Sequence, residues 1–312
     1  MDVRTILIGF SAAILFACGT ASNVPLDAGN DVADAANDVG GQLDAPSTTA
    51  TATTCSTWLA AQRETNLPST SGSNAVKRAD LLTAGGGYRK IDDTYYAAWF
   101  PAAHFDKSKR RIIFVLHGTK GAPEYEFADW KPSFDPRGYA FIGLKWYYEG
   151  KQAPDDYSNG ETLYQRMTAI LDEMDGPCGT KTANVSLLGF SRGSAQAFEV
   201  LARDRAGQQR IKSVVAVSGA WPTTMKPTDY LAALDTKGDT TAMTGGRMWM
   251  YCGGQDMDLG EPMCDILRNA KSWVERHGGT VQKLYENPSG GHHSMTDTPE
   301  ALTDAFDYVD SL

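Results

Sequence analysis

The sequence predicts an α/β fold in which a mostly parallel central sheet is covered by helices on both faces. Four near-continuous runs rich in Val, Ile and Leu have the composition of strands that are buried on both sides. Segments of helical composition at residues 160–174 and 192–205 lie between these runs, and strands that alternate with helices form parallel sheets through crossover connections. The runs are residues 111–118, 139–146, 184–190 and 212–220.

Further elements continue this pattern on both sides of the four runs. Residues 56–64 have helical composition, and after a glycine-rich turn at 85–87, apolar and polar residues alternate over 88–100, which is typical of an antiparallel pair of strands. A chain of 312 residues, 42% of them hydrophobic, is long enough for one large domain with a well-buried core. Downstream we expect strands at 247–254 and 281–287 and helices at 262–277 and 299–312.

The first residues have the features of an export signal. Residues 6–17 form an apolar run of secretory length, too short to span a bilayer comfortably. It ends in LFAC, which resembles the lipobox of a bacterial lipoprotein signal, with Cys18 as the acylated first mature residue; the alternative is a plain signal peptide with a chance cysteine. We therefore expect a signal peptide at 1–17 and an exported protein. It would be a cell-envelope lipoprotein, at the outer membrane or the cell surface and anchored to the membrane through Cys18, or a secreted protein if it is not lipidated.

Residues 18–54 read as a disordered tether. Between residues 19 and 54 there are five Asp, no Lys or Arg and no aromatic residue, followed by a run of Ser, Thr and Ala. Such a segment cannot bury enough apolar surface to offset the loss of chain entropy. The predicted organisation is thus a signal peptide, an acidic and Ser/Thr-rich tether, and a folded domain at 55–312.

Four cysteines remain in the predicted domain, an even number that suggests two disulfides in an exported chain. Four cysteines allow three pairings, and four free thiols are the alternative. The pairing that we favour joins Cys252 to its near neighbour Cys264, and Cys55 to Cys178. The formal net charge of −9 argues against a nucleic-acid partner, which requires clustered Lys and Arg; we expect a monomer.

The strongest motif is GFSRG at residues 189–193, a G-x-S-x-G pattern directly between a predicted strand and a predicted helix. A sharp turn at this place projects a serine hydroxyl above the sheet, and the small glycines relieve the crowding. The helix N-terminus behind Ser191 favours developing negative charge. Ser191 is therefore the candidate nucleophile, and a bystander serine in a tight turn is the alternative.

A serine nucleophile requires a general base and donors for an oxyanion. The sequence VLHGT at 115–119 ends an earlier buried strand, where this fold places one donor, so we assign the backbone N–H groups of Thr119 and Arg192 as oxyanion donors. Because His117 precedes the serine in the chain, it reads as a structural histidine. His104 reads as part of a surface turn, and His277 as the end of a helix.

Together, the HG turn, the GFSRG motif, a following acid and a late histidine resemble the α/β-hydrolase superfamily over residues 88–312. The resemblance implies an α/β-hydrolase fold with the order Ser, Asp, His along the chain. More finely, the short HG-T turn and the GGH segment look like secreted esterases of the feruloyl-esterase and polyhydroxyalkanoate-depolymerase type.

The segment MYCGGQDMD offers two candidate acids, Asp256 and Asp258, and the resemblance favours Asp256. The preceding strand end, VSGAWPTT, carries no carboxylate.

In GGHHSM, the superfamily pattern places the histidine directly after the glycine pair, which lets the loop pass close to the serine. This favours His292 over His293. A metal held by this pair is disfavoured because adjacent histidines point apart, and we expect neither metal nor cofactor.

The resemblance implies a serine esterase that acts on small or polymeric ester substrates through Ser191, Asp256 and His292. A peptidase or acyltransferase on the same residues, or an inactive surface-binding lipoprotein, are the alternatives. Since ligands bind at the carboxyl ends of parallel strands, aromatic residues there are candidates for the pocket wall: Trp146, Tyr147, Tyr148 and Trp221.

Overall fold

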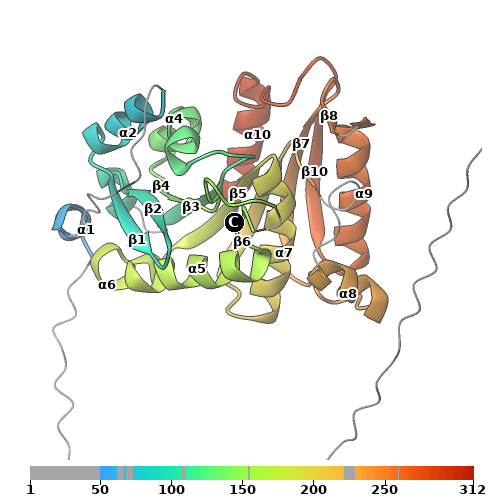
Figure 1. The fold of residues 1–312 in the computed structure, drawn as a ribbon, viewed down its shortest axis with the longest axis horizontal. Coiled ribbons are helices and arrows are strands. Elements are labelled where there is room, and N and C mark those ends of the chain that lie inside the picture. Colours follow the sequence, from blue (N-terminus) through green and yellow to red (C-terminus); the bar gives the residue numbers. More distant parts are fainter. Residues whose placement is uncertain are drawn as a thin grey trace, which may run out of the picture. The chain divides into compact units, whose positions relative to one another are not determined.

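The central sheet of the computed structural model is mostly parallel, as the sequence predicts (Figure 1). The structure describes residues 50–61, 67, 73–106, 110–153, 155–220, 229–258 and 260–312. The strand order in the sheet is β1-β2-β4-β3-β5-β6-β7-β10, and only the pairs β1/β2 and β2/β4 are antiparallel. The strands are β1 (Gly87–Ile91), β2 (Thr94–Trp99), β3 (Arg111–Leu116), β4 (Ala140–Leu144), β5 (Asn184–Phe190), β6 (Ile211–Val217), β7 (Arg247–Gly253) and β10 (Thr280–Asn287).

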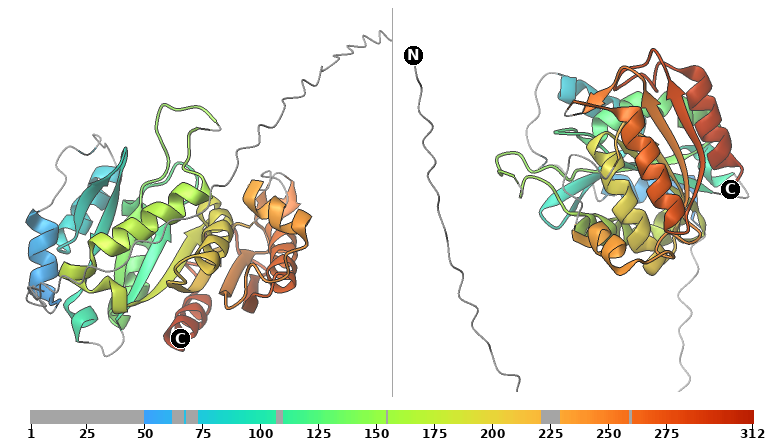
Figure 2. Two further views of the ribbon diagram at one scale, coloured as in Figure 1. Left: turned by 90° about the horizontal axis from the view of Figure 1, so that it is seen from below. Right: turned by 90° about the vertical axis from the view of Figure 1, so that its right-hand side faces the viewer.

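Helices cover both faces of this sheet (Figures 1 and 2). On one face, the core is closed by α1 (Ala52–Ala61), α5 (Gly160–Glu173), α7 (Arg192–Ala206) and α9 (Met263–Arg276). On the other it is closed by α2 (Ser73–Thr83), α4 (Pro123–Phe134) and α10 (Pro299–Asp310). The shorter elements are α3 (Ala102–Phe105), α6 (Asp175–Cys178), α8 (Asp229–Lys237), η1 (Asp135–Arg137), η2 (Thr180–Thr182), β8 (Met257–Asp258) and β9 (Glu261–Pro262).

Strand β3 illustrates why a continuous apolar run suits this sheet. Successive side chains point to opposite faces, so Phe114 packs on the side of α7 and Val115 on the side of α4. Both are fully or almost fully buried. In register, Leu116 at the end of β3 lies opposite Gly189 of β5. The register therefore brings the HG turn and the GFSRG turn to the same edge of the sheet.

Five α-helices of the described residues were not expected from the sequence: α2, α3, α4, α6 and α8. The helix predicted at 56–64 is α1, and it begins earlier, at Ala52. Thr51 and Thr54 explain this start, because each hydroxyl accepts a hydrogen bond from the backbone N–H of the other, at 2.8 and 3.1 Å. Such reciprocal bonds satisfy N–H groups that the first helical turn leaves without partners.

Both disulfides have the favoured pairing. Cys55–Cys178 joins α1 to α6, and Cys252–Cys264 joins the end of β7 to the start of α9. Among the described residues, no helix is both long and apolar enough to cross a membrane. The predicted signal peptide, the lipidation site at Cys18 and most of the predicted tether lie outside the described residues.

The two disulfides should contribute unequally to stability because they close loops of very different length. The Cys55–Cys178 bridge spans 123 residues and the Cys252–Cys264 bridge spans 12. Replacing Cys252 and Cys264 together by Ala should lower the free energy of unfolding by about 3 kcal/mol, and replacing Cys55 and Cys178 by about 5 kcal/mol. Guanidinium chloride unfolding of both double variants measures this, and a larger loss for the short loop would contradict it.

Candidate active site

Ser191 occupies the turn from β5 into α7 and has a strained backbone. Its φ is 53° and its ψ is −120°, a combination that non-glycine residues rarely adopt. The Ser191 N–H donates to the carbonyl of Val217 at 2.8 Å, which fixes the turn against β6. Such over-determined strain is found at functional sites, where the surroundings hold an unfavourable conformation in place.

The two glycines of the GFSRG motif are required by close backbone approaches. A Cβ on Gly193 would lie 2.1 Å from the carbonyl oxygen of Leu116, and one on Gly189 would lie 2.5 Å from the carbonyl oxygen of Gly193. Any larger residue would therefore push α7 away from β3 and β5. The turn is tight because the helix begins in direct contact with the end of the neighbouring strand.

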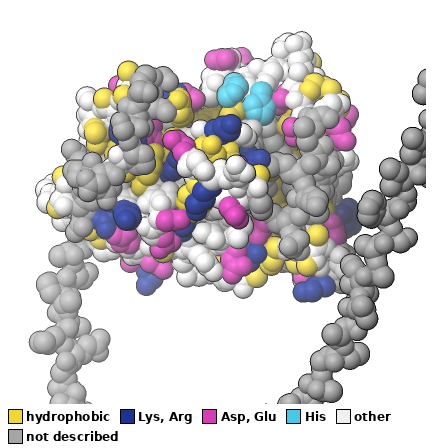
Figure 3. Space-filling model, viewed as in Figure 1, with side chains coloured by type: hydrophobic (Ala, Val, Ile, Leu, Met, Phe, Trp, Pro, Cys, Tyr) yellow, Lys and Arg dark blue, Asp and Glu magenta, His cyan; other side chains and the backbone are white. Residues whose placement is uncertain are grey.

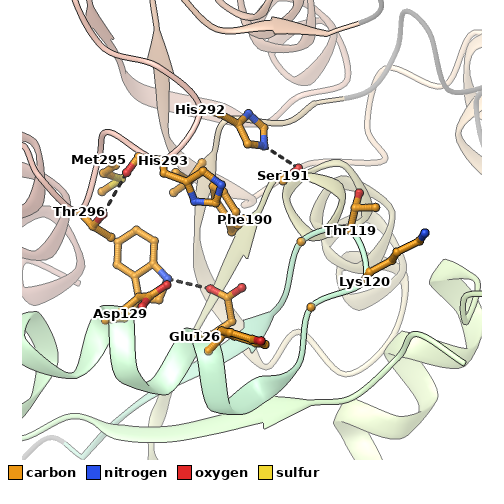
Figure 4. Close-up of a pocket in the computed structure, with 15 residues that line it drawn as sticks. Thr119, Lys120, Glu126, Asp129, Phe190, Ser191, His292, His293, Met295 and Thr296 are labelled. Atoms are coloured by element: carbon orange, nitrogen blue, oxygen red, sulfur yellow. Dashed lines mark hydrogen bonds between the residues drawn. The ribbon is translucent and has the colours of Figure 1, made fainter. Parts of the chain in front are cut away.

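Ser191, His292 and Asp256 form a hydrogen-bonded chain. His292 Nε2 lies 2.8 Å from Ser191 Oγ, and His292 Nδ1 lies 2.8 Å from Asp256 Oδ2. Figure 4 shows the His292 ring pointing to Ser191. The Asp256 side chain is only 4% exposed, whereas that of His292 is 35% exposed. The other candidate acid, Asp258, lies in β8, where it pairs with Glu261.

The loops that carry Asp256 and His292 are packed backbone to backbone. Gly254 and Gln255 donate their N–H groups to the carbonyls of Asn287 and Gly290, at 2.7 and 2.9 Å. A Cβ on Gly253 would lie 2.3 Å from the Gly290 oxygen. The glycine pair before His292 thus contacts the acid loop; the expectation that it makes room for the serine was wrong.

The short disulfide brackets the acid. Cys252 is the last residue but one of β7, Cys264 lies in the first turn of α9, and Asp256 lies between them. The Met263 N–H donates to the Asp256 carbonyl at 2.9 Å, and the Asp256 N–H to the Gly253 carbonyl at 3.1 Å. The backbone of Asp256 is therefore fixed from both sides.

The HG turn after β3 lies against the serine turn. A Cβ on Gly118 would be 3.2 Å from the Cβ of Ser191. The following residues are held by Tyr157, whose hydroxyl accepts a hydrogen bond from the Lys120 N–H at 2.7 Å. Thr119 and Arg192, the two residues assigned as oxyanion donors, thus flank Ser191 from two different elements.

His117 has a structural role, as expected from the sequence. It is fully buried, its Nδ1–H donates to the Gly118 carbonyl at 2.8 Å, and its Nε2 accepts from the Trp146 N–H at 3.2 Å. Burial lowers the pKa of His117 to about 3, so the ring is neutral at physiological pH. It therefore holds the end of β3 to the end of β4.

The expectation for His104 was wrong. This residue lies in α3, is fully buried, and hydrogen-bonds to the Arg111 carbonyl at 3.1 Å. Its ring packs between Phe100 and Phe105, at 5.3 and 5.0 Å between centroids, and burial lowers its pKa to about 4. The polar residues that follow, from Asp106 on, suggested a surface turn, although both aromatic partners lie within four residues of His104 in the sequence.

A cavity of about 380 Å³ opens beside Ser191 and His292. Its walls come largely from α4 and from the loop after His292, and the exposed histidines gather on this face of the molecule (Figures 3 and 4). Aromatic wall residues are Tyr125, Trp130 and Phe190. His293 also lines it, 4.7 Å from Phe190 between ring centroids.

The aromatic residues expected in the pocket wall are placed differently. Trp146 is fully buried and its indole N–H donates to the His117 carbonyl at 3.2 Å, so it supports the HG turn instead of lining the cavity.

The two tyrosines after β4 have other partners. Tyr148 hydrogen-bonds to Asp93 and Ser158, and Tyr147 packs on Tyr157. Trp221 lies outside the described residues.

Glu126 of α4 is a buried carboxyl that faces the cavity, and the sequence gave no reason to expect it. It is 5% exposed, and its Oε2 accepts a hydrogen bond from the Trp130 indole N–H at 2.9 Å (Figure 4). Burial raises the pKa of Glu126 to about 7, and the charge of Asp129 adds to this. The spacing of Phe127, Trp130 and Phe134 after Pro123 is the helical signal that could have revealed α4.

No family model and no curated protein matches the sequence. Solved structures do match. The carboxylesterase EstE1, cloned from a metagenomic library, has a TM-score of 0.55 at 14% identity, covering 77% of this chain and 97% of its own. The esterase Pf2001 of Pyrococcus furiosus has a TM-score of 0.51 at 14% identity over 75% and 94%. Est1E of Butyrivibrio proteoclasticus, with ferulic acid bound, has a TM-score of 0.50 at 13% identity, covering 72% of this chain and 98% of its own.

At these identities the likeness concerns the fold. The chain has the α/β-hydrolase fold that the sequence resemblance implied.

The raised pKa of Glu126 predicts a pH-dependent stability. The folded state holds this proton more tightly than the unfolded chain, whose glutamate has a pKa near 4.5. The stabilisation from Glu126 is therefore complete below pH 4.5 and is lost as the pH rises through 7. Glu126→Gln keeps an acceptor for Trp130 and does not ionise. The free energy of unfolding of this variant, minus that of wild type, should therefore rise by on the order of 3 kcal/mol between pH 4.5 and pH 8.

Guanidinium chloride unfolding at both pH values measures this gain, and exposed Glu149→Gln is the matched control. Parallel pH curves for Glu126→Gln and wild type would show that the carboxyl is not buried as described.

Proposed function

We propose that this chain is an exported serine hydrolase that cleaves carboxylic esters through an acyl-enzyme. The observation that carries the proposal is the chain of two 2.8 Å contacts from Ser191 through His292 to Asp256. A serine hydroxyl is a poor nucleophile unless an oriented base removes its proton. The esterases among the structures that share the fold support the substrate class.

In the proposed reaction, Ser191 Oγ attacks the carbonyl carbon of the ester while its proton passes to His292 Nε2. Asp256 accepts a hydrogen bond from His292 Nδ1–H, which fixes the tautomer and stabilises the imidazolium. The C–O bond to the alcohol then breaks, and the imidazolium returns its proton to the leaving alkoxide. A water, activated by the same imidazole, attacks the acyl-enzyme, releases the carboxylic acid and restores Ser191.

The backbone N–H groups of Thr119 and Arg192 would stabilise the oxyanion of both tetrahedral intermediates. Thr119 follows Gly118, which lies against Ser191. Arg192 is the first residue of α7, where N–H groups lack intrahelical partners and the helix dipole favours negative charge. Each donor of this kind contributes roughly 10²–10³ in rate.

Export and membrane attachment remain part of the proposal. The apolar run at 6–17, the lipobox-like sequence ending in Cys18 and the acidic tether support a lipid-anchored enzyme of the cell envelope. Two disulfides within the described residues agree with an oxidising compartment. Anchoring through Cys18 would hold the catalytic domain at the membrane on a tether.

Ester hydrolysis by the soluble domain tests the proposal. A protein that starts at Ala50, and so retains all of α1, should hydrolyse 4-nitrophenyl acetate and butyrate, and a fluorophosphonate should label Ser191. Ser191→Ala should lower kcat by about 10⁴-fold or more while it leaves thermal unfolding nearly unchanged. Hydrolysis of neither ester above the Ser191→Ala background, without labelling, would refute an esterase.

The two adjacent histidines should differ in their effects. His292→Ala removes the base that contacts Ser191 and should lower kcat by about 10⁴-fold or more. His293 lines the cavity through its contact with Phe190, so His293→Ala should mainly raise KM. Steady-state kinetics of both variants decide this, and the reverse pattern would move the base by one residue.

A further inference from the structure

A second cavity, of about 430 Å³, opens on Ser191. The two cavities share only Thr119, Ser191 and His292, so they meet at the reacting atoms. The first cavity carries the buried carboxyl of Glu126. The second carries the guanidinium-bearing residue Arg192, from the first turn of α7.

Arg192 has no acidic partner within the described part of the chain, unlike the other arginines of its helix. Arg203 pairs with Glu199, and Arg205 pairs with Asp204, at 2.7 and 2.6 Å. The Arg192 Nε is buried and has no hydrogen-bond partner. A guanidinium always carries its charge. Leaving one without a counter-ion beside a nucleophile costs free energy unless a ligand supplies the anion.

The Arg192 guanidinium is nevertheless held in a defined place. Its Cζ lies 4.0 Å from the centroid of the Tyr157 ring. Tyr157 is itself fixed, because its hydroxyl accepts from the Lys120 N–H and its ring packs 4.8 Å from that of Trp146. A guanidinium stacked on an aromatic face keeps its N–H edge free for a bidentate bond to a carboxylate.

The carboxylates that line the second cavity do not neutralise Arg192. Asp256 is bonded to His292, and Asp258 lies in β8 opposite Glu261. Asp258 has a further interaction of its own, and no ion pair between described residues joins either carboxylate to the guanidinium. Much of the remaining wall is small or apolar, with Ala195, Gly219 and Met263 among its residues. Among the described residues that line this cavity, Arg192 is the one Lys or Arg.

We propose that the Arg192 side chain makes the enzyme selective for esters that carry a carboxylate near the scissile bond. This inference rests on the proposed esterase function and names its substrate class. Arg192 would then act twice: its backbone N–H would bind the oxyanion, and its guanidinium would bind the substrate carboxylate. Salt weakens such a charge pair, so the selectivity should fall as ionic strength rises.

Two matched pairs of esters test the proposal and separate the two sides of the scissile bond. On the acyl side, mono-4-nitrophenyl adipate is compared with 4-nitrophenyl methyl adipate. On the alcohol side, 4-acetoxybenzoate is compared with 4-acetoxybenzamide. In wild type, kcat/KM should favour the carboxylate in at least one pair by roughly 10- to 100-fold, the range expected for a charge-assisted hydrogen-bonded pair.

Variants assign the preference to the guanidinium. Arg192→Gln should bring the ratio of kcat/KM within that pair close to one, and Arg192→Lys should retain part of it. Ratios are compared because the Arg192 backbone belongs to the catalytic machinery, so absolute rates can change in both variants. Lys120→Gln, which removes a cation that lines the first cavity instead, is the matched control and should keep most of the preference.

The outcomes distinguish this inference from the proposed function. Ser191-dependent hydrolysis without a carboxylate preference in either pair, or a preference that survives in Arg192→Gln, would overturn the role of Arg192 and leave the esterase standing. If wild type hydrolyses none of the four esters and no fluorophosphonate labels Ser191, the esterase proposal fails and the substrate class fails with it.

Discussion

The strained turn at Ser191 is the constraint on which the other features of the site depend. Its positive φ lifts the hydroxyl off the sheet, and α7 can begin there only because Gly193 lies against the Leu116 carbonyl. That contact joins β3, β5 and α7 at one point. The backbone at the HG turn, the serine and the helix N-terminus are thereby brought within reach of one substrate carbonyl.

The acid and the base are positioned by a different device. Their loops follow the adjacent parallel strands β7 and β10, and the acid loop donates two backbone hydrogen bonds to the loop before His292. Glycine at 253 permits this approach, and the Cys252–Cys264 bridge ties the acid loop to α9. The loops that carry Asp256 and His292 are therefore fixed to each other, and the strand register places both beside Ser191.

The two cavities that meet at Ser191 are chemically unlike. One is walled by aromatic side chains and has a buried carboxyl at Glu126; the other has the guanidinium of Arg192, whose Nε has no hydrogen-bond partner among the described residues. A substrate that spans both would be oriented by charge as well as by shape. A buried guanidinium nitrogen without a hydrogen-bond partner lowers the stability of the fold, and a ligand that bonds to the guanidinium would offset that cost.

The sequence by itself predicted the strands of the central sheet and the serine turn, because hydrophobic runs and glycine spacing are local signals. It favoured, among alternatives, one disulfide pairing and, through the family resemblance, Asp256 and His292. It did not determine α4, the burial of His104 and Trp146, or the charges of the two cavities. Burial raises the pKa of Glu126, and the Arg192 Nε is buried without a hydrogen-bond partner among the described residues. Only the tertiary structure decides which polar groups are desolvated and which find a partner.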